Sequence, residues 1–206
     1  MNRCLALIAL ATLLTPRAAT AEGERAVAGS ATLYGYVAPD QPDFLMLVAP
    51  VDVRRRLHLE GRYNYESLRT GALFFGMNGE VGERVRLRAT GMMGGVFGQV
   101  FGVAPGVRLV LTTWKLDLFV EAEYVLDVLT PSASFFYAWS ELGLSPLPWA
   151  RVCLVAQRTH VFRNDLEIQR GLCAGVHLFD RVDLTAYELN LGWAAPIYVG
   201  AVAVSY

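Results

Sequence analysis

Long hydrophobic runs are missing from most of this sequence. After Ala21, no charge-free apolar stretch approaches the roughly 20 residues that a membrane-spanning helix requires. Yet 54% of the residues are hydrophobic. Because the chain is this apolar without long runs, its apolar residues must be interleaved with polar ones. The sequence therefore excludes a bundle of transmembrane helices and makes the spacing of apolar positions the feature to examine.

The sequence also lacks an excess of charge of either sign. The formal net charge is −1, which leaves neither a basic patch for nucleic acid nor an acidic tail. Lysine occurs once, at Lys115, and the other members of the lysine and arginine set are all arginine. A guanidinium group suits pairing with carboxylates or phosphates better than loose solvation. We therefore expect paired charges and no nucleic-acid partner.

Histidine is also scarce. The three histidines, His58, His160 and His177, are scattered along the chain, whereas the ligands of a metal site must converge on one point. We expect no metal and no cofactor.

The first 21 residues have the pattern of an export signal. The positive Arg3 precedes an apolar stretch from Cys4 to Leu14, and Ala19 and Ala21 give the small-x-small sequence that signal peptidase accepts. The apolar stretch is too short to cross a membrane as a helix. We expect a cleavable signal peptide over residues 1–21, followed by one domain over residues 22–206.

Polar and apolar residues alternate with a period of two in several stretches, which predicts β-strands. The pattern returns over residues 84–91, 116–124 and 181–186. Any one such strand would also fit a soluble β-sandwich. Between residues 56 and 66, one face collects Leu57, Leu59, Gly61, Tyr63 and Tyr65, and the other collects Arg56, His58, Glu60, Arg62, Asn64 and Glu66.

The last strand carries a resemblance to a known class. One face of it holds Tyr198, Gly200, Val202, Val204 and Tyr206. An alternating strand that ends the chain on an aromatic residue resembles the assembly signal of bacterial outer-membrane β-barrel proteins. The resemblance covers about ten residues, the length of one strand in such barrels, and the export signal supports it.

This resemblance implies an all-β fold, a closed antiparallel transmembrane β-barrel in the outer membrane of a Gram-negative bacterium. Closure is required because an open sheet edge in lipid would leave backbone groups unsatisfied. The implied partners are outer-membrane lipid, lipopolysaccharide and, during insertion, the barrel-assembly machinery.

Short turns divide the chain into about twelve strands. If the C-terminus is periplasmic, the shorter connections all fall on the periplasmic side, as is typical of such barrels. Ten strands is the alternative, because the second stretch is continuous rather than alternating and Pro50 follows it. The expected strands are Thr32–Val37, Phe44–Val48, Leu57–Tyr65, Leu68–Asn78, Arg84–Gly95, Val107–Thr113, Leu116–Leu126, Phe135–Leu144, Ala150–Thr159, Leu166–Leu178, Val182–Leu189 and Ile197–Tyr206.

The polar faces of these strands predict a charged lumen. Arg84, Arg86 and Arg88 form a basic ladder on one strand, which favours a narrow passive channel for small, anionic solutes. Alternatively, the arginines and carboxylates interlock and fill the barrel, because about twelve strands lies between barrels that are filled and barrels that are open. The candidate lumen-lining residues are Arg56, His58, Glu60, Arg62, Arg84, Arg86, Arg88, Arg108, Glu121, Glu123, Glu141 and Arg151.

Two other functions stay open. A non-conducting barrel could bind lipid or a protein partner through its outer rim. A lipid-modifying hydrolase would need a histidine at the outer rim, where only His160, beside Asp165, has the right height, and no serine adjoins it. We predict no catalytic residue and consider an enzyme the less favoured reading.

Three further features lead to specific expectations. Cys153 and Cys173 fall opposite each other if the hairpin centres on Arg163, which allows a cross-strand disulfide, with two buried thiols as the alternative. Arg158 and Arg170 have outward-facing parity and could pair with lipid phosphates, unless a β-bulge turns them inward. The glycine-rich stretch from 91 to 106 is expected to hold glycine kinks and an outer loop that folds inward as a constriction.

Overall fold

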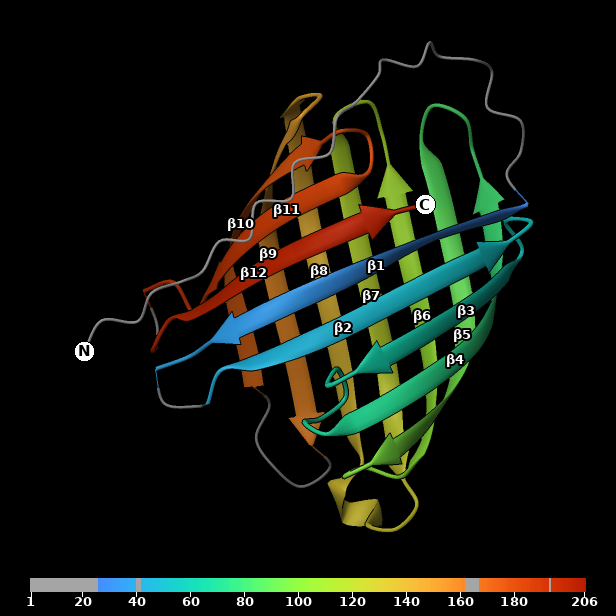
Figure 1. Cartoon of the computed structure of the whole chain (residues 1–206), viewed down its shortest axis with the longest axis vertical. Coiled ribbons are helices and arrows are strands. Elements are labelled where there is room, and N and C mark those ends of the chain that lie inside the picture. The colour runs from blue at the N-terminus through green and yellow to red at the C-terminus, as the bar shows by residue number, and fades with distance from the viewer. Residues whose placement is uncertain (1–25, 40–41, 162–166, 193) are drawn as a thin grey trace.

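The computed structural model describes residues 26–39, 42–161, 167–192 and 194–206 of the 206-residue chain. Twelve strands follow one another around a closed barrel, each antiparallel to its neighbours, and β12 closes the ring against β1 (Figure 1). No helix in these ranges is long and apolar enough to cross a membrane. The elements are β1 (Val27–Val37), β2 (Phe44–Val53), β3 (Leu57–Tyr63), β4 (Thr70–Val81), β5 (Arg86–Gly98), β6 (Gly102–Thr112), β7 (Leu116–Asp127), the short 3-10 helix η1 (Pro131–Ala133), β8 (Phe135–Leu147), β9 (Ala150–Val161), β10 (Glu167–Leu178), β11 (Val182–Leu189) and β12 (Ile197–Ser205).

The prediction of about twelve strands is confirmed, and the alternative of ten is wrong. The doubtful second strand exists and runs on through Pro50 to Val53. Proline lacks the N–H group that a sheet ladder requires. The ladder between β1 and β2 is accordingly interrupted between the pairs Gly29–Val51 and Thr32–Val48 and keeps its register on both sides. Pro50 therefore costs ladder bonds without ending the strand.

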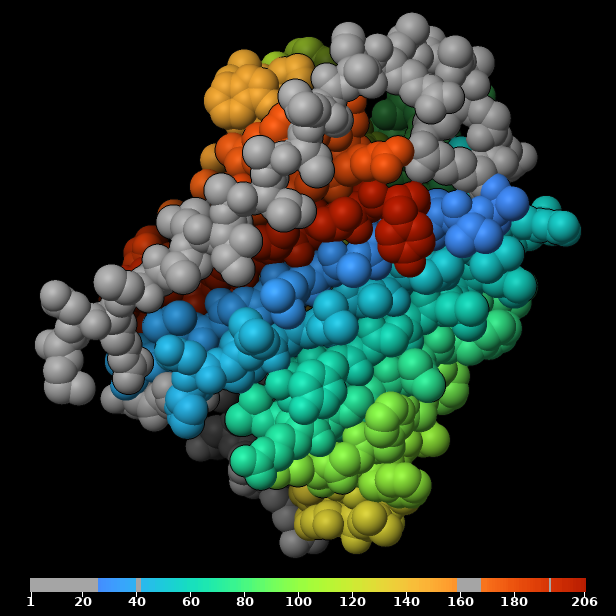
Figure 2. Space-filling view, viewed as in Figure 1, coloured from blue at the N-terminus to red at the C-terminus, as the bar shows by residue number. Residues whose placement is uncertain are grey.

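The alternation of the sequence separates an outer face from a lumen. On β3, Leu59 and Tyr63 are exposed on the outer face, whereas His58, Glu60 and Arg62 are buried inside. Figure 2 shows β12, β1 and β2 as adjacent bands of the outer wall. Apolar residues on the outer face and polar residues inside are the arrangement of a membrane barrel, the reverse of a soluble sandwich.

The connections define two ends of the barrel. The end that we call the short-turn end holds connections of two to four residues, at 54–56, 82–85, 113–115, 148–149 and 179–181. The opposite end, which we call the loop end, holds the connections at 38–43, 64–69, 99–101, 128–134, 162–166 and 190–196. The predicted separation of shorter from longer connections is broadly confirmed.

The prediction of a glycine-rich outer loop that folds inward is wrong. β5 continues to Gly98 and β6 begins at Gly102, so only residues 99–101 connect them. The glycines serve the strands instead, because a neighbouring aromatic ring lies where a side chain would stand. A Cβ atom on Gly94 would lie 2.5 Å from the ring of Phe74.

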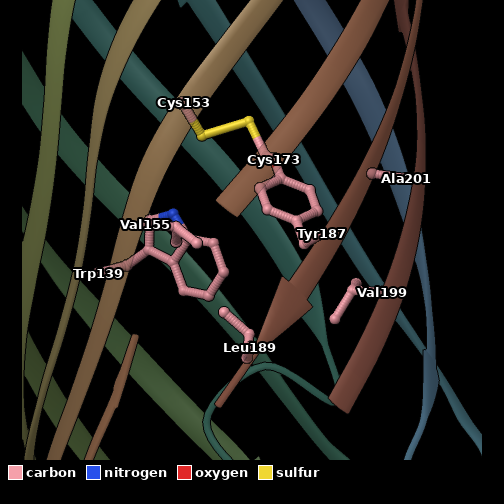
Figure 3. Packing of buried hydrophobic residues seen from close by; sticks show 8 residues of the cluster. All are labelled: Trp139, Cys153, Val155, Cys173, Tyr187, Leu189, Val199 and Ala201. Atoms are coloured by element: carbon pink, nitrogen blue, oxygen red, sulfur yellow. A yellow bond between two sulfur atoms is a disulfide. The ribbon is translucent and has the colours of Figure 1, made fainter. Parts of the chain in front are cut away.

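Two apolar clusters occupy the lumen, the first toward the loop end and the second extending from there to Cys153 on β9. One contains Phe74, Met92, Val96 and Val125 with small alanines. The other is shown in Figure 3 and comprises Trp139, Cys153, Val155, Cys173, Tyr187, Leu189, Val199 and Ala201. The interior is therefore filled by side chains over this part of its length.

Candidate functional site

A cluster of charged side chains lies in the middle of the lumen. Strands β3, β6 and β7 and the connection between β3 and β4 contribute to it, because alternating residues on each strand point inward. Five of the seven side chains are buried, with Arg62 only 4% exposed, and the other two are half-buried. We call the set the central charge cluster; its members are Glu60, Arg62, Tyr65, Glu66, Arg108, Glu121 and Glu123.

Arg62 is the centre of this cluster. Its guanidinium nitrogens lie 2.5 Å from Glu60, 3.0 Å from Glu121 and 2.8 Å from Glu123. A fourth carboxylate, that of Glu66, lies 3.5 Å away. The guanidinium carbon also lies 4.3 Å from the ring centroid of Tyr65 and 4.1 Å from that of Phe74. A planar cation with several donors can satisfy this many partners, which an ammonium group could not.

Arg108 joins the carboxylates of β3 and β7. Its Nη2 lies 2.7 Å from Glu60 and 2.5 Å from Glu121. Arg108 stands directly opposite Glu121 across the hairpin of β6 and β7. Four carboxylates thus share two guanidinium groups, so the central charge cluster has an excess of acid.

The β3–β4 connection folds into the lumen and completes the cluster. Asn64 has a positive φ of 59° and begins this connection, whose base closes through the bond from the Asn64 N–H to the Thr70 carbonyl. Tyr65 then points inward and donates a 2.8 Å hydrogen bond to Glu121. Its ring packs edge-on against Tyr137, with centroids 5.4 Å apart. The inward loop is therefore residues 64–69, not the glycine-rich stretch.

Two carboxylate oxygens of the cluster have no hydrogen-bond partner among the described residues. They are Glu66 Oε2 and Glu123 Oε1, both buried. The other oxygens of the same two carboxylates face the same nitrogen of Arg62. The acidic excess is thus concentrated beside the inward loop.

A row of polar contacts leads from the cluster toward the short-turn end. His58 lies 3.3 Å from Glu60 and 2.9 Å from Asp52. Asp52 in turn pairs with Arg88 at 2.5 Å, and Asn78 donates to it at 2.7 Å. The lumen is polar from the central charge cluster to this end.

A second group of charges lies on the other side of the lumen. Arg151 contacts Asp117 at 2.5 Å and Glu141 at 2.7 Å. Glu141 also accepts hydrogen bonds from the Trp139 indole at 3.0 Å and from the Tyr187 hydroxyl at 3.1 Å. The expectation of interlocking arginines and carboxylates describes both groups.

The basic ladder is not a free row of charge. Arg86 pairs with Glu80 at 3.2 Å, and Arg88 pairs with Asp52. Arg84 lies in an exposed turn before β5, and Arg56 lies in an exposed turn before β3. The strands begin later than expected, so Arg56 and Arg84 lie at the mouth of the short-turn end and not on the lumen wall.

The prediction for Tyr65 was also wrong. The sequence pattern placed this residue on the outer, apolar face of a strand that was expected to continue to it. The strand ends at Tyr63, so the alternation no longer applies two residues later. The signal that could have found this end is Asn64, a residue type that tolerates positive φ.

Cys153 and Cys173 are direct cross-strand neighbours on β9 and β10, in the predicted register. Their Cα atoms lie 4.9 Å apart and their sulfurs are bonded (Figure 3). Glu141 lies beside them, and these three are the one group of potential metal ligands found among the described residues. Because both sulfurs are bonded to each other, the group offers no thiolate for a metal.

The remaining candidates lie on the outer face or outside the described residues. Tyr198, Val202 and Val204 are exposed on the outer face of β12, and their role as an assembly signal stays a prediction. Tyr206 exchanges backbone hydrogen bonds with Gly29 and so takes part in closing the barrel. The signal peptide over 1–21, the side chain of His160 and Asp165 fall outside the described parts of the chain, so the export and hydrolase hypotheses stay predictions.

Comparison with known proteins gives a match at the level of fold. No family model matches the chain, and no curated protein matches it. The NanC porin matches with a TM-score of 0.61 at 8% identity, covering 85% of this chain and 98% of that one. The Pseudomonas aeruginosa protein OccK11 (OpdR) matches with a TM-score of 0.47 at 8% identity over 84% of this chain and 62% of its own, which is too weak to add to the argument. The chain therefore has the fold of a bacterial outer-membrane porin, and the predicted class of outer-membrane β-barrels is confirmed at that level.

Proposed function

We propose that this protein is a narrow passive channel for small solutes in the outer membrane of a Gram-negative bacterium, with the loop end facing outside. Export by residues 1–21 and insertion by the barrel-assembly machinery belong to the same proposal. The porin fold supports it, as does a lumen whose polar rows run from the short-turn end to the central charge cluster. A polar interior is what a solute path through lipid requires.

The proposal rests mainly on the part of the chain to which Tyr65 and Glu66 belong. Both side chains help to fill the middle of the lumen, but they come from a connection and not from the barrel wall. The loop could withdraw them while the bonds at its base and the twelve-strand ladder stay intact. We infer that the lumen is closed at this level in the conformation described here, because five of the seven cluster side chains are buried and the other two are half-buried.

The charges favour small cations over the anions suggested by the basic ladder. Both ladder arginines on β5 have acidic partners, whereas the central charge cluster holds four carboxylates against two guanidinium groups. Rings of acidic side chains favour cations in channels. The solute class proposed here is therefore small cations and small uncharged molecules.

Planar-bilayer recording on the purified protein tests this function. We expect small, brief conductance steps for the wild type and a several-fold increase in conductance or open time for Tyr65→Ala. Tyr63→Ala is the matched control, because Tyr63 is exposed on the outer face. The channel proposal is overturned if neither the wild type nor Tyr65→Ala gives single-channel steps while both are shown to be folded.

A non-conducting barrel is the second candidate, and the apolar clusters favour it. Side chains such as Val125 and Leu189 are fully buried inside the loop half of the barrel. Such a barrel would act through its outer face. Silent bilayers for the wild type and both tyrosine variants are the result expected for this candidate.

A further inference from the structure

The outer face of the barrel is almost free of charge. Along the described strands, the outward-facing rows carry three charged side chains, Arg158, Arg170 and Glu188. All three lie on the consecutive strands β9, β10 and β11, which are side by side (Figure 1). Charge on this face is therefore confined to one wall of the barrel.

Arg158 and Arg170 are diagonal neighbours. Arg158 stands opposite Ile168, and Arg170 stands opposite Ala156. Diagonal positions in antiparallel strands are about 7–8 Å apart, which long side chains can bridge. The register of β9 and β10 continues without a break from Ala150 to Thr159, so no bulge turns the two arginines into the lumen. Both are exposed on the outer face.

Neither arginine has an acidic partner in the described parts of the chain, where every ion pair within 4.0 Å involves other residues. Glu188 stands opposite Leu172, diagonal to Arg170, and forms no such pair with it. The two outward-facing arginines therefore differ from the arginines that point into the lumen, which are paired with carboxylates. Two unpaired cations within reach of each other can chelate one polyvalent anion.

An apolar groove begins close to Arg170 on the same face of the barrel. It has a volume of about 710 Å³ and crosses β7 to β12 on the outer face. Its lining combines the small residues Ala174 and Ala186, which face each other across β10 and β11, with larger side chains such as Leu154 and Leu172, and Glu188 is its one charged residue. Arg170 lies two residues along β10 from Leu172, on the same face and nearer the loop end.

The geometry points to a binding site for a phosphorylated lipid of the outer leaflet, with its phosphate between Arg158 and Arg170 and an acyl chain in the groove. Guanidinium groups bind phosphate through paired, charge-assisted hydrogen bonds. An outward-facing arginine is tolerated best at the level of the lipid headgroups, and both arginines lie three residues from the loop end of their strands. Tyr198 borders the groove, and exposed tyrosines are enriched at the membrane interface.

Binding to lipid A tests the site. The purified barrel in a non-ionic detergent is titrated with bisphosphorylated lipid A, and retained lipid is counted by native mass spectrometry. We expect the double variant R158Q/R170Q to bind at least about tenfold more weakly, the loss that follows from removing a charge-assisted pair. The control R56Q/R84Q removes two charges of the same kind from exposed turns at the short-turn end, away from the outer leaflet, and should bind as the wild type does.

Two further arms separate the phosphate from the acyl chain. Dephosphorylated lipid A should bind the wild type and R158Q/R170Q equally weakly, and inorganic phosphate alone should not stabilise the protein against heat. A174L/A186L, which fills the groove, should weaken lipid A binding and leave both arginines in place. Equal binding of bisphosphorylated lipid A by wild type and R158Q/R170Q would overturn the site, whatever the bilayer recordings show about conduction.

Discussion

Arg62 is the residue on which the interior of this barrel depends most. It is buried, and it faces four carboxylates from three parts of the chain. A buried ion pair contributes little net stability when complete, but removing one partner leaves uncompensated charge in a poorly solvated place. The lumen therefore tolerates the loss of Arg62 far less than the loss of an exposed arginine.

We expect Arg62→Met to lower the free energy of unfolding by about 3–5 kcal/mol, the range for breaking a buried ion pair. Arg86→Met is the control, since Arg86 is exposed at the rim in a single pair with Glu80, and it should change stability by less than about 1 kcal/mol. Urea unfolding in detergent micelles, followed by tryptophan fluorescence, measures both.

A rescue variant separates charge from packing. Adding Glu123→Gln to Arg62→Met removes one of the uncompensated carboxylates, so the double variant should be more stable than Arg62→Met alone. Equal stability of the two would show that Arg62 acts through packing against Tyr65 and Phe74 and not through its charge.

For single residues, the sequence predicted the direction in which side chains point better than it predicted which side chains they contact. Alternation placed Arg62, Arg108 and Glu121 in the lumen, because side-chain direction in a strand depends only on parity. Which of them meet across the barrel depends on strand tilt and closure, which parity does not contain. Tyr65 was missed for a related reason, since parity applies only while the strand continues.

The elements were predicted well where turns are short. A short turn fixes the register of the two strands that it joins, and the pairs Arg108–Glu121 and Cys153–Cys173 both follow from that rule. The glycine-rich stretch failed because glycine marks loops and also marks strand positions that a neighbouring ring covers. Gly94 under Phe74 is of the second kind, which only the neighbouring strand reveals.

The disulfide between β9 and β10 gives an element-scale prediction. Replacing both cysteines, in Cys153→Ser/Cys173→Ser, should lower the free energy of unfolding by about 3 kcal/mol, because the cross-link spans a loop of similar length to those for which that value holds. Urea unfolding with and without a reductant measures it, and the reductant should affect only the wild type. Labelling of the unfolded, non-reduced protein by a maleimide, measured on a chain without residues 1–21 and so without Cys4, would contradict the pairing.

Closure of the barrel determines, for the molecule as a whole, that the inward-facing side chains of all strands share one interior. With β12 paired to β1, every strand has two neighbours, and the inner row of each strand faces a shared interior. Charges far apart in the sequence, such as Glu66 and Glu123, then act on the same space. The net charge of the lumen is a sum over the side chains of all strands, and the arginine ladder of one strand did not predict it.

The proposed preference for cations can be tested on the opened channel. In the background of Tyr65→Ala, Glu66→Gln and Glu123→Gln together remove two negative charges from the central charge cluster. A unit charge about 10 Å from an ion, at an effective dielectric constant of about 20, contributes about 1.7 kcal/mol, somewhat more than a factor of ten in ion population. We therefore expect the reversal potential in a potassium chloride gradient to move from the cation side toward the anion side. Glu80→Gln, which removes one exposed rim charge in the same background, should move it much less, and an opened channel that already prefers chloride before these substitutions would contradict the acidic cluster as its filter.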